Sequence, residues 1–288
     1  MIADLAVLAA PGTARLGEAP RVVALGGSAP AVHFTDLLEG TVFRLDGDEA
    51  SAALEFPGET ASAIIPLDDG RTVIALHRSL AVLGTDGDVE RRIELDLPAG
   101  TRLSDATAGP SGHLWLGVVP AGDDPAPGQL LRLGDDGVRV AREGLGFSNG
   151  IGFTADGSRL LHIDSTPGIV WSIPHDPATG ELGEPERLYV HDEVGALDGL
   201  CLDEHDRVYV AVFGGGEVLC LDGGAVAARI LVPALRVSSC VLDGRSLYIT
   251  TARVDAPEEE LAEFPLSGSL FRFELDASNG PVWEGHLS

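Results

Sequence analysis

Short apolar stretches alternate with glycine-containing turns along the whole chain. Many of these stretches alternate between buried-type and small or polar side chains, as in Leu114 to Val118, which is the period of a half-buried β-strand. The turns carry Asp-Gly or Ser-Gly pairs, in which glycine accepts a positive φ without a Cβ clash. One acidic, proline-bearing segment, 255–264, is the candidate for a helix or a loose insertion. The pattern predicts an all-β protein of short strands.

The turns recur at a regular spacing. A first series runs through Gly26, Gly70, Gly112, Gly157, Asp206 and Gly244, and a second through Gly47, Gly87, Gly137, Gly180 and Gly223. Steps of 38 to 50 residues with several short strands per unit are typical of a β-propeller. Since no shift in composition marks a boundary, we expect one six-bladed domain over residues 1–288. The strand expected at residues 2–9 would pair with the last blade and close the ring.

One position in the repeated unit lies eight residues before the first turn. It is occupied by Glu18, Ser62, Ser104, Asn149 and Asp198. The first strand of a propeller blade lines the central channel, so these side chains would meet at one mouth. Glu18, Asn149 and Asp198 supply hard oxygen donors, which suit Ca²⁺, Mg²⁺ or Mn²⁺. They predict one divalent metal in the channel; the alternative is that Asn149 and Asp198 only cap blade entrances through Asx-turns.

Charge and cysteine content limit the binding partners and the cellular location that we expect. The chain has 45 acidic and 19 basic residues, a formal net charge of −26, which argues against nucleic acid and anionic membranes as partners. No apolar run is long enough to span a bilayer, and the first residues lack the basic region of a signal peptide. The cysteines Cys201, Cys220 and Cys240 form no Cys-x-x-Cys pair and are expected to be small buried hydrophobes. We expect a cytoplasmic protein with a small-molecule substrate; its oligomeric state is left open.

Three short motifs carry a family resemblance. Residues 16–20 (Leu-Gly-Glu-Ala-Pro), 148–150 (Ser-Asn-Gly) and 197–199 (Leu-Asp-Gly) resemble the Gly-Glu-Gly-Pro, Ser-Asn-Gly and Pro-Asp-Gly motifs of the gluconolactonase, senescence marker protein and luciferin-regenerating enzyme family. Residues 176–180 and 213–217 also look like stretches of that family. The resemblance covers essentially the whole chain. It implies a six-bladed propeller that binds one divalent metal through Glu18, Asn149 and Asp198 and hydrolyses a lactone or related ester.

This resemblance suggests roles for individual residues. The metal, with calcium expected first and magnesium, manganese or zinc as alternatives, would act as a Lewis acid on the ester carbonyl. Asp198 is the first candidate for the general base and Asp105 the second, while Arg102 would orient the substrate through its fork of donors. Two other functions remain open on the same frame: a non-hydrolytic biosynthetic enzyme, such as a cyclase or dehydratase, and a non-catalytic small-molecule-binding propeller.

The chain departs from the family pattern where sugar lactonases bind substrate hydroxyls. The usual Arg-x-Asn-Asp-Gly is here Arg102-Leu-Ser104-Asp105-Ala106, and Ala121 stands where a glutamate often follows the next strand. Ser104 reaches less far than asparagine, and Ala121 offers no polar group. We therefore expect gluconolactone to be a poor substrate and a less hydroxylated lactone to be a better one.

A Gly-x-Ser-x-Gly sequence at residues 146–150 matches the nucleophile elbow of serine hydrolases. That elbow requires a helix after the serine, whereas a strand and an Asp-Gly hairpin are expected here. Ser148 is therefore not predicted to be a nucleophile. His77, His162 and His191 are expected to be surface or packing residues.

Overall fold

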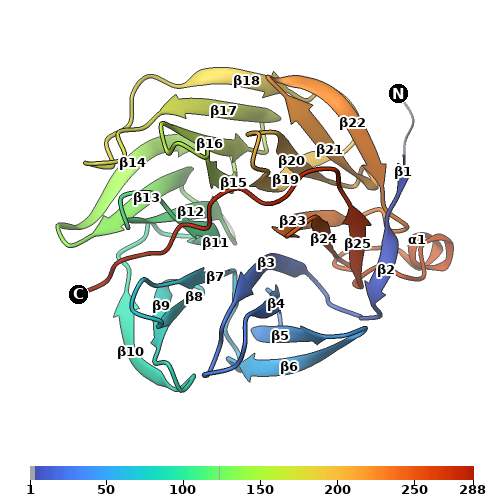
Figure 1. Cartoon of the computed structure of the whole chain (residues 1–288), viewed down its shortest axis with the longest axis horizontal. Coiled ribbons are helices and arrows are strands. Elements are labelled where there is room, and N and C mark those ends of the chain that lie inside the picture. Colours follow the sequence, from blue (N-terminus) through green and yellow to red (C-terminus); the bar gives the residue numbers. More distant parts are fainter. Residues whose placement is uncertain (1–3, 123) are drawn as a thin grey trace.

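Six sheets stand around a central axis in the computed structural model, which describes residues 4–122 and 124–288 (Figure 1). Five of them have four strands and one has five, and all the strand pairs are antiparallel except that of one short N-terminal strand. The innermost strands of neighbouring sheets pack against each other around the whole ring: β3 on β7, β7 on β11, β11 on β15, β15 on β19, β19 on β23, and β23 on β3. The ring is therefore closed, and the predicted six-bladed, all-β propeller is confirmed.

Each blade runs outward from its innermost strand. Blades one to three consist of β3 (Gly17–Val23), β4 (Ala31–Asp36), β5 (Thr41–Asp46) and β6 (Glu49–Glu55); β7 (Ala63–Pro66), β8 (Thr72–Ala75), β9 (Ser79–Leu83) and β10 (Val89–Glu94); and β11 (Thr101–Ala108), β12 (Leu114–Pro120), β13 (Gly128–Gly134) and β14 (Gly137–Leu145). Blades four and five consist of β15 (Ser148–Phe153), β16 (Arg159–Asp164), β17 (Ile169–Pro174) and β18 (Glu186–Val190); and β19 (Ala196–Leu202), β20 (Val208–Phe213), β21 (Glu217–Asp222) and β22 (Ala225–Leu231). Blade six contains β23 (Val237–Asp243), β24 (Ser246–Thr251) and β25 (Leu270–Glu274).

The start of the chain completes blade six. β2 (Val7–Ala10) pairs antiparallel with β25 and is the outer strand of that blade, while β1 (Asp4–Leu5) pairs parallel with β22 at the edge of blade five. The N-terminal strand thus joins the last two blades and covers strand edges that an open ring would expose. The expected pairing with the last blade is confirmed; residues 2 and 3 of the expected strand lie outside the described part.

The turn glycines adopt the conformation that the repeat predicts. All eleven residues of the two turn series have positive φ, including 77° at Gly112 and 88° at Gly137. The one non-glycine among them, Asp206, has φ 61°, in the left-handed region that aspartate tolerates better than most residues. Its carboxylate accepts a hydrogen bond from the Ala155 N–H at 2.6 Å, which links this turn to the neighbouring blade.

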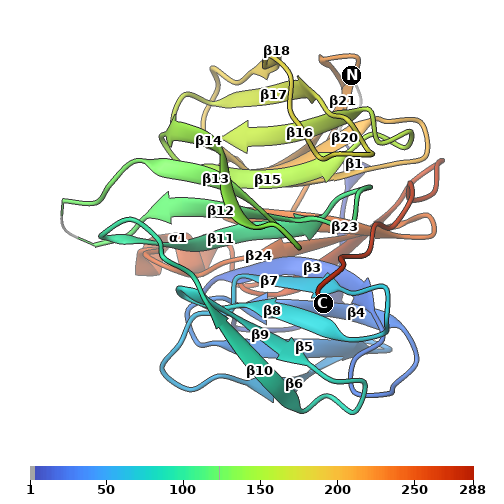
Figure 2. The same ribbon diagram turned by 90° about the vertical axis from the view of Figure 1, so that its left-hand side faces the viewer.

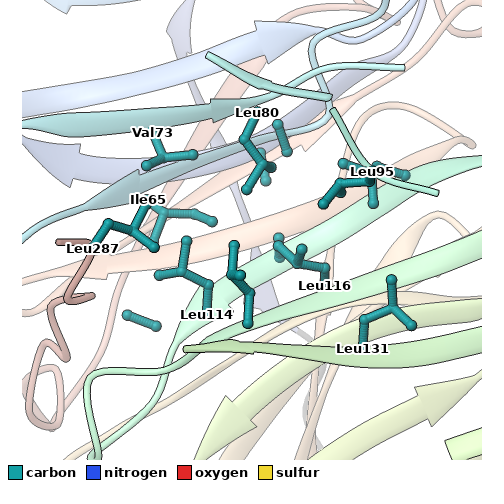
Figure 3. Close-up of a cluster of buried hydrophobic side chains, with 14 of the residues drawn as sticks. Ile65, Val73, Leu80, Leu95, Leu114, Leu116, Leu131 and Leu287 are labelled. Atoms are coloured by element: carbon teal, nitrogen blue, oxygen red, sulfur yellow. The ribbon is translucent and has the colours of Figure 1, made fainter. Parts of the chain in front are cut away.

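The core lies between the blades. Figure 3 shows one of these layers, in which Ile65 and Val73 of blade two face Leu114 and Leu116 of blade three. Leu287, near the end of the chain, packs into the same layer. Because each sheet buries both of its faces against neighbouring blades, the inner strands are apolar on both faces.

The two faces of the ring differ. The connection between β24 and β25 contains α1 (Glu258–Glu263), which lies within the segment 255–264 that was a candidate for a helix or a loose insertion, and it projects on one face. Residues 276–288, here called the C-terminal strap, cross the opposite face (Figures 1 and 2). The strap is held to blade two by the Gly285 N–H on the Pro66 carbonyl and to blade three by the His286 N–H on the Gly112 carbonyl, at 2.8 and 2.7 Å. Among the described residues, no helix has the length and apolar character needed to cross a membrane.

Candidate functional site

A cavity of about 360 Å³ opens at the end of the channel away from the strap, and we call it the mouth cavity. Four of the five residues that share the predicted position line it: Glu18, Ser104, Asn149 and Asp198. The fifth, Ser62, is buried and donates to the Ala75 carbonyl. The structure therefore brings the two carboxylates and the amide from blades one, four and five to one place.

A repeated irregularity of the innermost strands accompanies the site. In every blade except the second, the pairing of the innermost strand shifts register near its start: after Glu18, Leu103, Asn149, Leu197 and Val237. Such a bulge re-aims the side chains beside it. The β7–β8 pairing of blade two runs in continuous register, and Ser62 of that blade is the residue that does not reach the mouth cavity.

Hydrogen bonds connect the polar residues of the mouth cavity across three blades. The Ser104 hydroxyl donates to Asn149 Oδ1 at 2.9 Å, and Asn149 Nδ2 donates to Asp198 Oδ1 at 2.7 Å and to Ser165 Oγ at 3.1 Å. Glu18 Oε2 accepts from the Ala19 N–H at 3.1 Å. Ala19 has φ 44°, a left-handed conformation that is costly for a residue with a Cβ and that is often found beside functional groups.

The acidic groups around the channel raise one another's pKa. Burial raises the pKa of Glu18 to about 8, and the charge of Asp105 acts in the same direction. Burial and then the charge of Glu18 raise the pKa of Asp198 well above its usual range. The Arg102 guanidinium opposes both shifts but does not cancel them. The site therefore concentrates more negative charge than its own arginines balance.

This arrangement fits a hard divalent cation. Two carboxylates and an amide oxygen are the donor types that such ions prefer, and a cation would relieve the repulsion between the acids. No group of three His, Cys, Asp or Glu side chains suited to a metal is found in residues 4–122 and 124–288, so the amide of Asn149 is needed to complete the set. Its Nδ2 faces Asp198; a half-turn of the amide group would bring Oδ1 to that side instead.

Of the other residues expected at the site, one lines the mouth cavity and two do not. Arg102 lines the mouth cavity, and its Nη1 donates to the Leu103 carbonyl at 2.8 Å. Asp105 lines a different cavity on the strap side, and burial raises its pKa to about 6. Ala121 follows β12, where its N–H donates to the Gly100 carbonyl, and it is not among the residues that line the mouth cavity.

Sequence reasoning missed the apolar wall of the mouth cavity. Leu37, Phe147, Phe213 and Val254 contribute to it from positions at or just beyond strand ends. A single apolar residue beside a turn gives no signal that it faces a ligand, so only the assembled ring identifies these side chains. The mouth cavity thus combines these apolar side chains with the ionisable groups of Glu18, Arg102 and Asp198.

The insertion that contains α1 is tied to this wall. The Arg236 guanidinium lies over the Phe213 ring at 5.6 Å, and its Nε donates to Glu260 of α1 at 2.7 Å. Val254, at the start of the insertion, itself lines the cavity. The position of the helix is thereby linked to the shape of the mouth.

Ser148 is a packing residue in this structure. It is fully buried, and the strand β15 follows it, as predicted. His162 lies 2.8 Å from the Ser148 hydroxyl through Nε2, but Arg142 Nη1 donates to its Nδ1 at 2.8 Å. The imidazole therefore carries its proton on Nε2 and donates to serine, whereas a catalytic base would accept from it.

Comparisons with known proteins place the chain in a family. The family model described as "SMP-30/Gluconolactonase/LRE-like region" matches residues 16–253. A pentonolactonase of Haloferax volcanii is 30% identical over 285 residues, which cover 95% of each protein. Among solved structures, a calcium-binding regucalcin from Agrobacterium tumefaciens matches 100% of both chains with a TM-score of 0.87 and 22% identity. A luciferin-regenerating enzyme matches 96% of this chain and 97% of its own with a TM-score of 0.82 and 24% identity. The chain therefore belongs to the SMP-30/gluconolactonase/LRE-like family.

Proposed function

We propose that this protein hydrolyses a lactone or a related ester in the mouth cavity. The observation that carries the proposal is the convergence of Glu18, Asn149 and Asp198 on one cavity that Arg102 also lines. The pentonolactonase relative, whose name describes cleavage of a cyclic ester, supports the same reaction class.

Glu18, Asn149 and Asp198 would hold one divalent cation, with Ca²⁺ first in expectation and Mg²⁺, Mn²⁺ or Zn²⁺ as alternatives. When bound, the cation would polarise the ester carbonyl and stabilise the negative charge that develops on its oxygen. Arg102 would orient the substrate through its planar fork of donors. Its charge also lowers the pKa of both carboxyl groups and so offsets part of the rise that burial causes.

Asp198 is our candidate for the group that takes a proton from the attacking water. It lines the mouth cavity with the other two proposed ligands, so one of its carboxylate oxygens could bind the cation while the other receives the proton. Asp105, the second candidate, lines the other cavity, on the strap side of the channel, and is not among the residues that line the mouth cavity. We therefore assign proton transfer to Asp198.

The walls of the mouth cavity favour a substrate with few hydroxyl groups. Phe147, Phe213 and Leu37 offer no hydrogen-bond partner from their side chains, and the Ser104 hydroxyl already donates to Asn149. A substrate hydroxyl buried there without a partner would cost roughly 1–3 kcal/mol. We propose that the substrate is an aliphatic or aromatic lactone and not a polyhydroxylated sugar lactone. The name of the pentonolactonase relative describes a sugar lactone as the substrate of that protein.

A panel of lactones tests the proposal. Purified protein is assayed for acid release from gluconolactone, a pentonolactone, unsubstituted δ-valerolactone and an aromatic lactone, first with Ca²⁺ and then with excess chelator. We expect turnover of at least one lactone that is abolished by chelator and restored by Ca²⁺. Asp198→Asn should abolish it, whereas Glu143→Gln, an exposed change on β14, should not. A protein that binds the cation but turns over no lactone would contradict the proposed reaction.

A further inference from the structure

The strap-side end of the channel contains two thiols in contact. A second cavity, of about 100 Å³, lies under the C-terminal strap, and we call it the strap-side cavity. Cys201 of β19 and Cys240 of β23 both line it, and their sulfurs are 3.6 Å apart. The two residues are separated by 39 positions in the chain and belong to different blades. The third cysteine, Cys220, lies on β21 in blade five and does not line this cavity.

The contact follows from the close approach of two innermost strands. A Cβ added to Gly199 of β19 would meet Ser239 Cα of β23 at 2.8 Å, so the backbones touch at this level. Cys201 and Cys240 follow directly along the same two strands. A disulfide bond has a sulfur–sulfur length of about 2.05 Å, so the two sulfurs must approach by about 1.5 Å. Side-chain rotation supplies such a movement without separating the blades.

The surroundings of the pair determine how much reactive thiolate it forms. Burial raises the pKa of the Cys201 thiol well above its usual range, and the hydrogen bond with Cys240 adds to this. The Arg21 guanidinium, which lines the same cavity, acts in the opposite direction and favours the thiolate. Arg21 Nη2 donates to the Ala106 carbonyl at 3.4 Å, while its Nε has no hydrogen-bond partner within the described residues. Asp105 and Asp203 line the same cavity, and the charge of Asp203 also raises the pKa of the Cys201 thiol. Since the thiolate is the reactive species, oxidation should be faster in alkaline solution.

The cavity has room for a small oxidant. A cavity needs about 10–15 Å³ to hold one water molecule. Hydrogen peroxide is about as large as two waters, so it fits into a cavity of about 100 Å³. Cys201 is the more exposed of the two thiols and is the one that peroxide reaches first.

We propose that Cys201 and Cys240 form a reversible disulfide that joins blade five to blade six when the protein meets a small peroxide. The Cys201 thiolate attacks one peroxide oxygen, which breaks the O–O bond and gives a sulfenic acid and hydroxide. The Cys240 sulfur then attacks the Cys201 sulfur and displaces the oxygen of the sulfenic acid as water. The two thiol protons end in water, so two thiols and one hydrogen peroxide give one disulfide and two waters.

Oxidation should strengthen the ring. The bond would close a loop of 39 residues between the innermost strands of neighbouring blades, while the N-terminal strands β1 and β2 join the same two blades at their outer edges. Restricting the unfolded chain in this way stabilises the fold, and for a protein of this size we expect a rise in Tm of roughly 5 °C. The proposal does not depend on the reaction catalysed in the mouth cavity.

The test is oxidation of the full-length, reduced protein by hydrogen peroxide at pH 8.5, followed by thiol counting, intact mass and peptide mapping. We expect the free thiols to fall from three to one, the mass to fall by about 2 Da, and a Cys201–Cys240 peptide that disappears with dithiothreitol. Cys220→Ser is the matched control and should behave in the same way. Cys201→Ala and Cys240→Ala should each form no intramolecular link and show no peroxide-dependent rise in Tm.

A second variant tests the role of Arg21. Arg21→Met should slow disulfide formation several-fold at pH 8.5 while leaving its end point unchanged, because the cation favours the thiolate. The proposal is overturned if folded wild-type protein keeps three thiols, forms a link through Cys220, or accumulates sulfinic acid at Cys201 without a link. It is also overturned if Cys220→Ser abolishes the bond in a folded protein.

Discussion

Replacing His162 with glutamine should remove part of the acid sensitivity of the fold. His162 is fully buried on β16, and burial lowers its pKa to about 3, with the neighbouring Arg142 charge acting in the same direction. In the unfolded chain the pKa of histidine is about 6.5. As the pH falls below that value, the imidazole of His162 binds a proton in the unfolded chain but not in the folded protein. The stability that neutral His162 provides is therefore complete above about pH 6.5 and is lost progressively down to about pH 3.

The size of the effect follows from these two pKa values. At pH 5 the pH lies about 1.5 units below the pKa of histidine in the unfolded chain. Protonation of the unfolded chain therefore lowers the free energy of unfolding by about 2 kcal/mol. Glutamine cannot be protonated, and its amide N–H can still donate to the Ser148 hydroxyl, as Nε2 of His162 does at 2.8 Å. It fits the Arg142 contact less well, so the variant should be less stable at pH 7 by about 1 kcal/mol.

Urea denaturation at pH 7 and pH 5 provides the measurement. For wild type and for His205→Gln, an exposed control, the free energy of unfolding should fall by the same amount between the two pH values. For His162→Gln the fall should be smaller by about 2 kcal/mol. If His162→Gln and wild type show the same pH dependence, the folded protein accepts the proton on His162, and the assigned tautomer and its hydrogen bonds are wrong.

Three further predictions concern the site and the domain. Glu18→Gln should weaken Ca²⁺ binding at least about tenfold in equilibrium dialysis, because it removes one charge from a hard-cation site, and wild type should bind one ion per chain; unchanged affinity would exclude Glu18 as a ligand. Ser104→Asn should raise kcat/KM for gluconolactone relative to δ-valerolactone by about tenfold or more; an unchanged ratio would show that this position does not read the substrate, and a tenfold wild-type preference for gluconolactone would refute the proposed substrate class. Limited proteolysis should yield no separable folded fragment, since the N-terminal strand β2 completes the last blade; two stable halves would contradict a single domain.

The repeat and its turns were predictable because they depend on local chemistry. Glycine is the residue that most readily takes a positive φ, so Gly70 and Gly157 mark turns wherever the rest of the chain lies. A polar residue at a fixed distance before such a turn occupies the same level of each blade. For that reason Glu18, Asn149 and Asp198 could be placed together before their contacts were known.

Tertiary structure decided which side each of these residues faces. Side chains alternate along a strand, so a shift of one residue exchanges the two faces, and a bulge makes such a shift without a marked sequence signal. Blade two lacks the shift in the pairing of its inner strands, and Ser62 stays out of the mouth cavity. Asp105, one residue beyond Ser104, faces the strap-side cavity. The contact between Cys201 and Cys240 also depends on the closed ring, because only the convergence of neighbouring inner strands brings residues so distant in sequence within 3.6 Å.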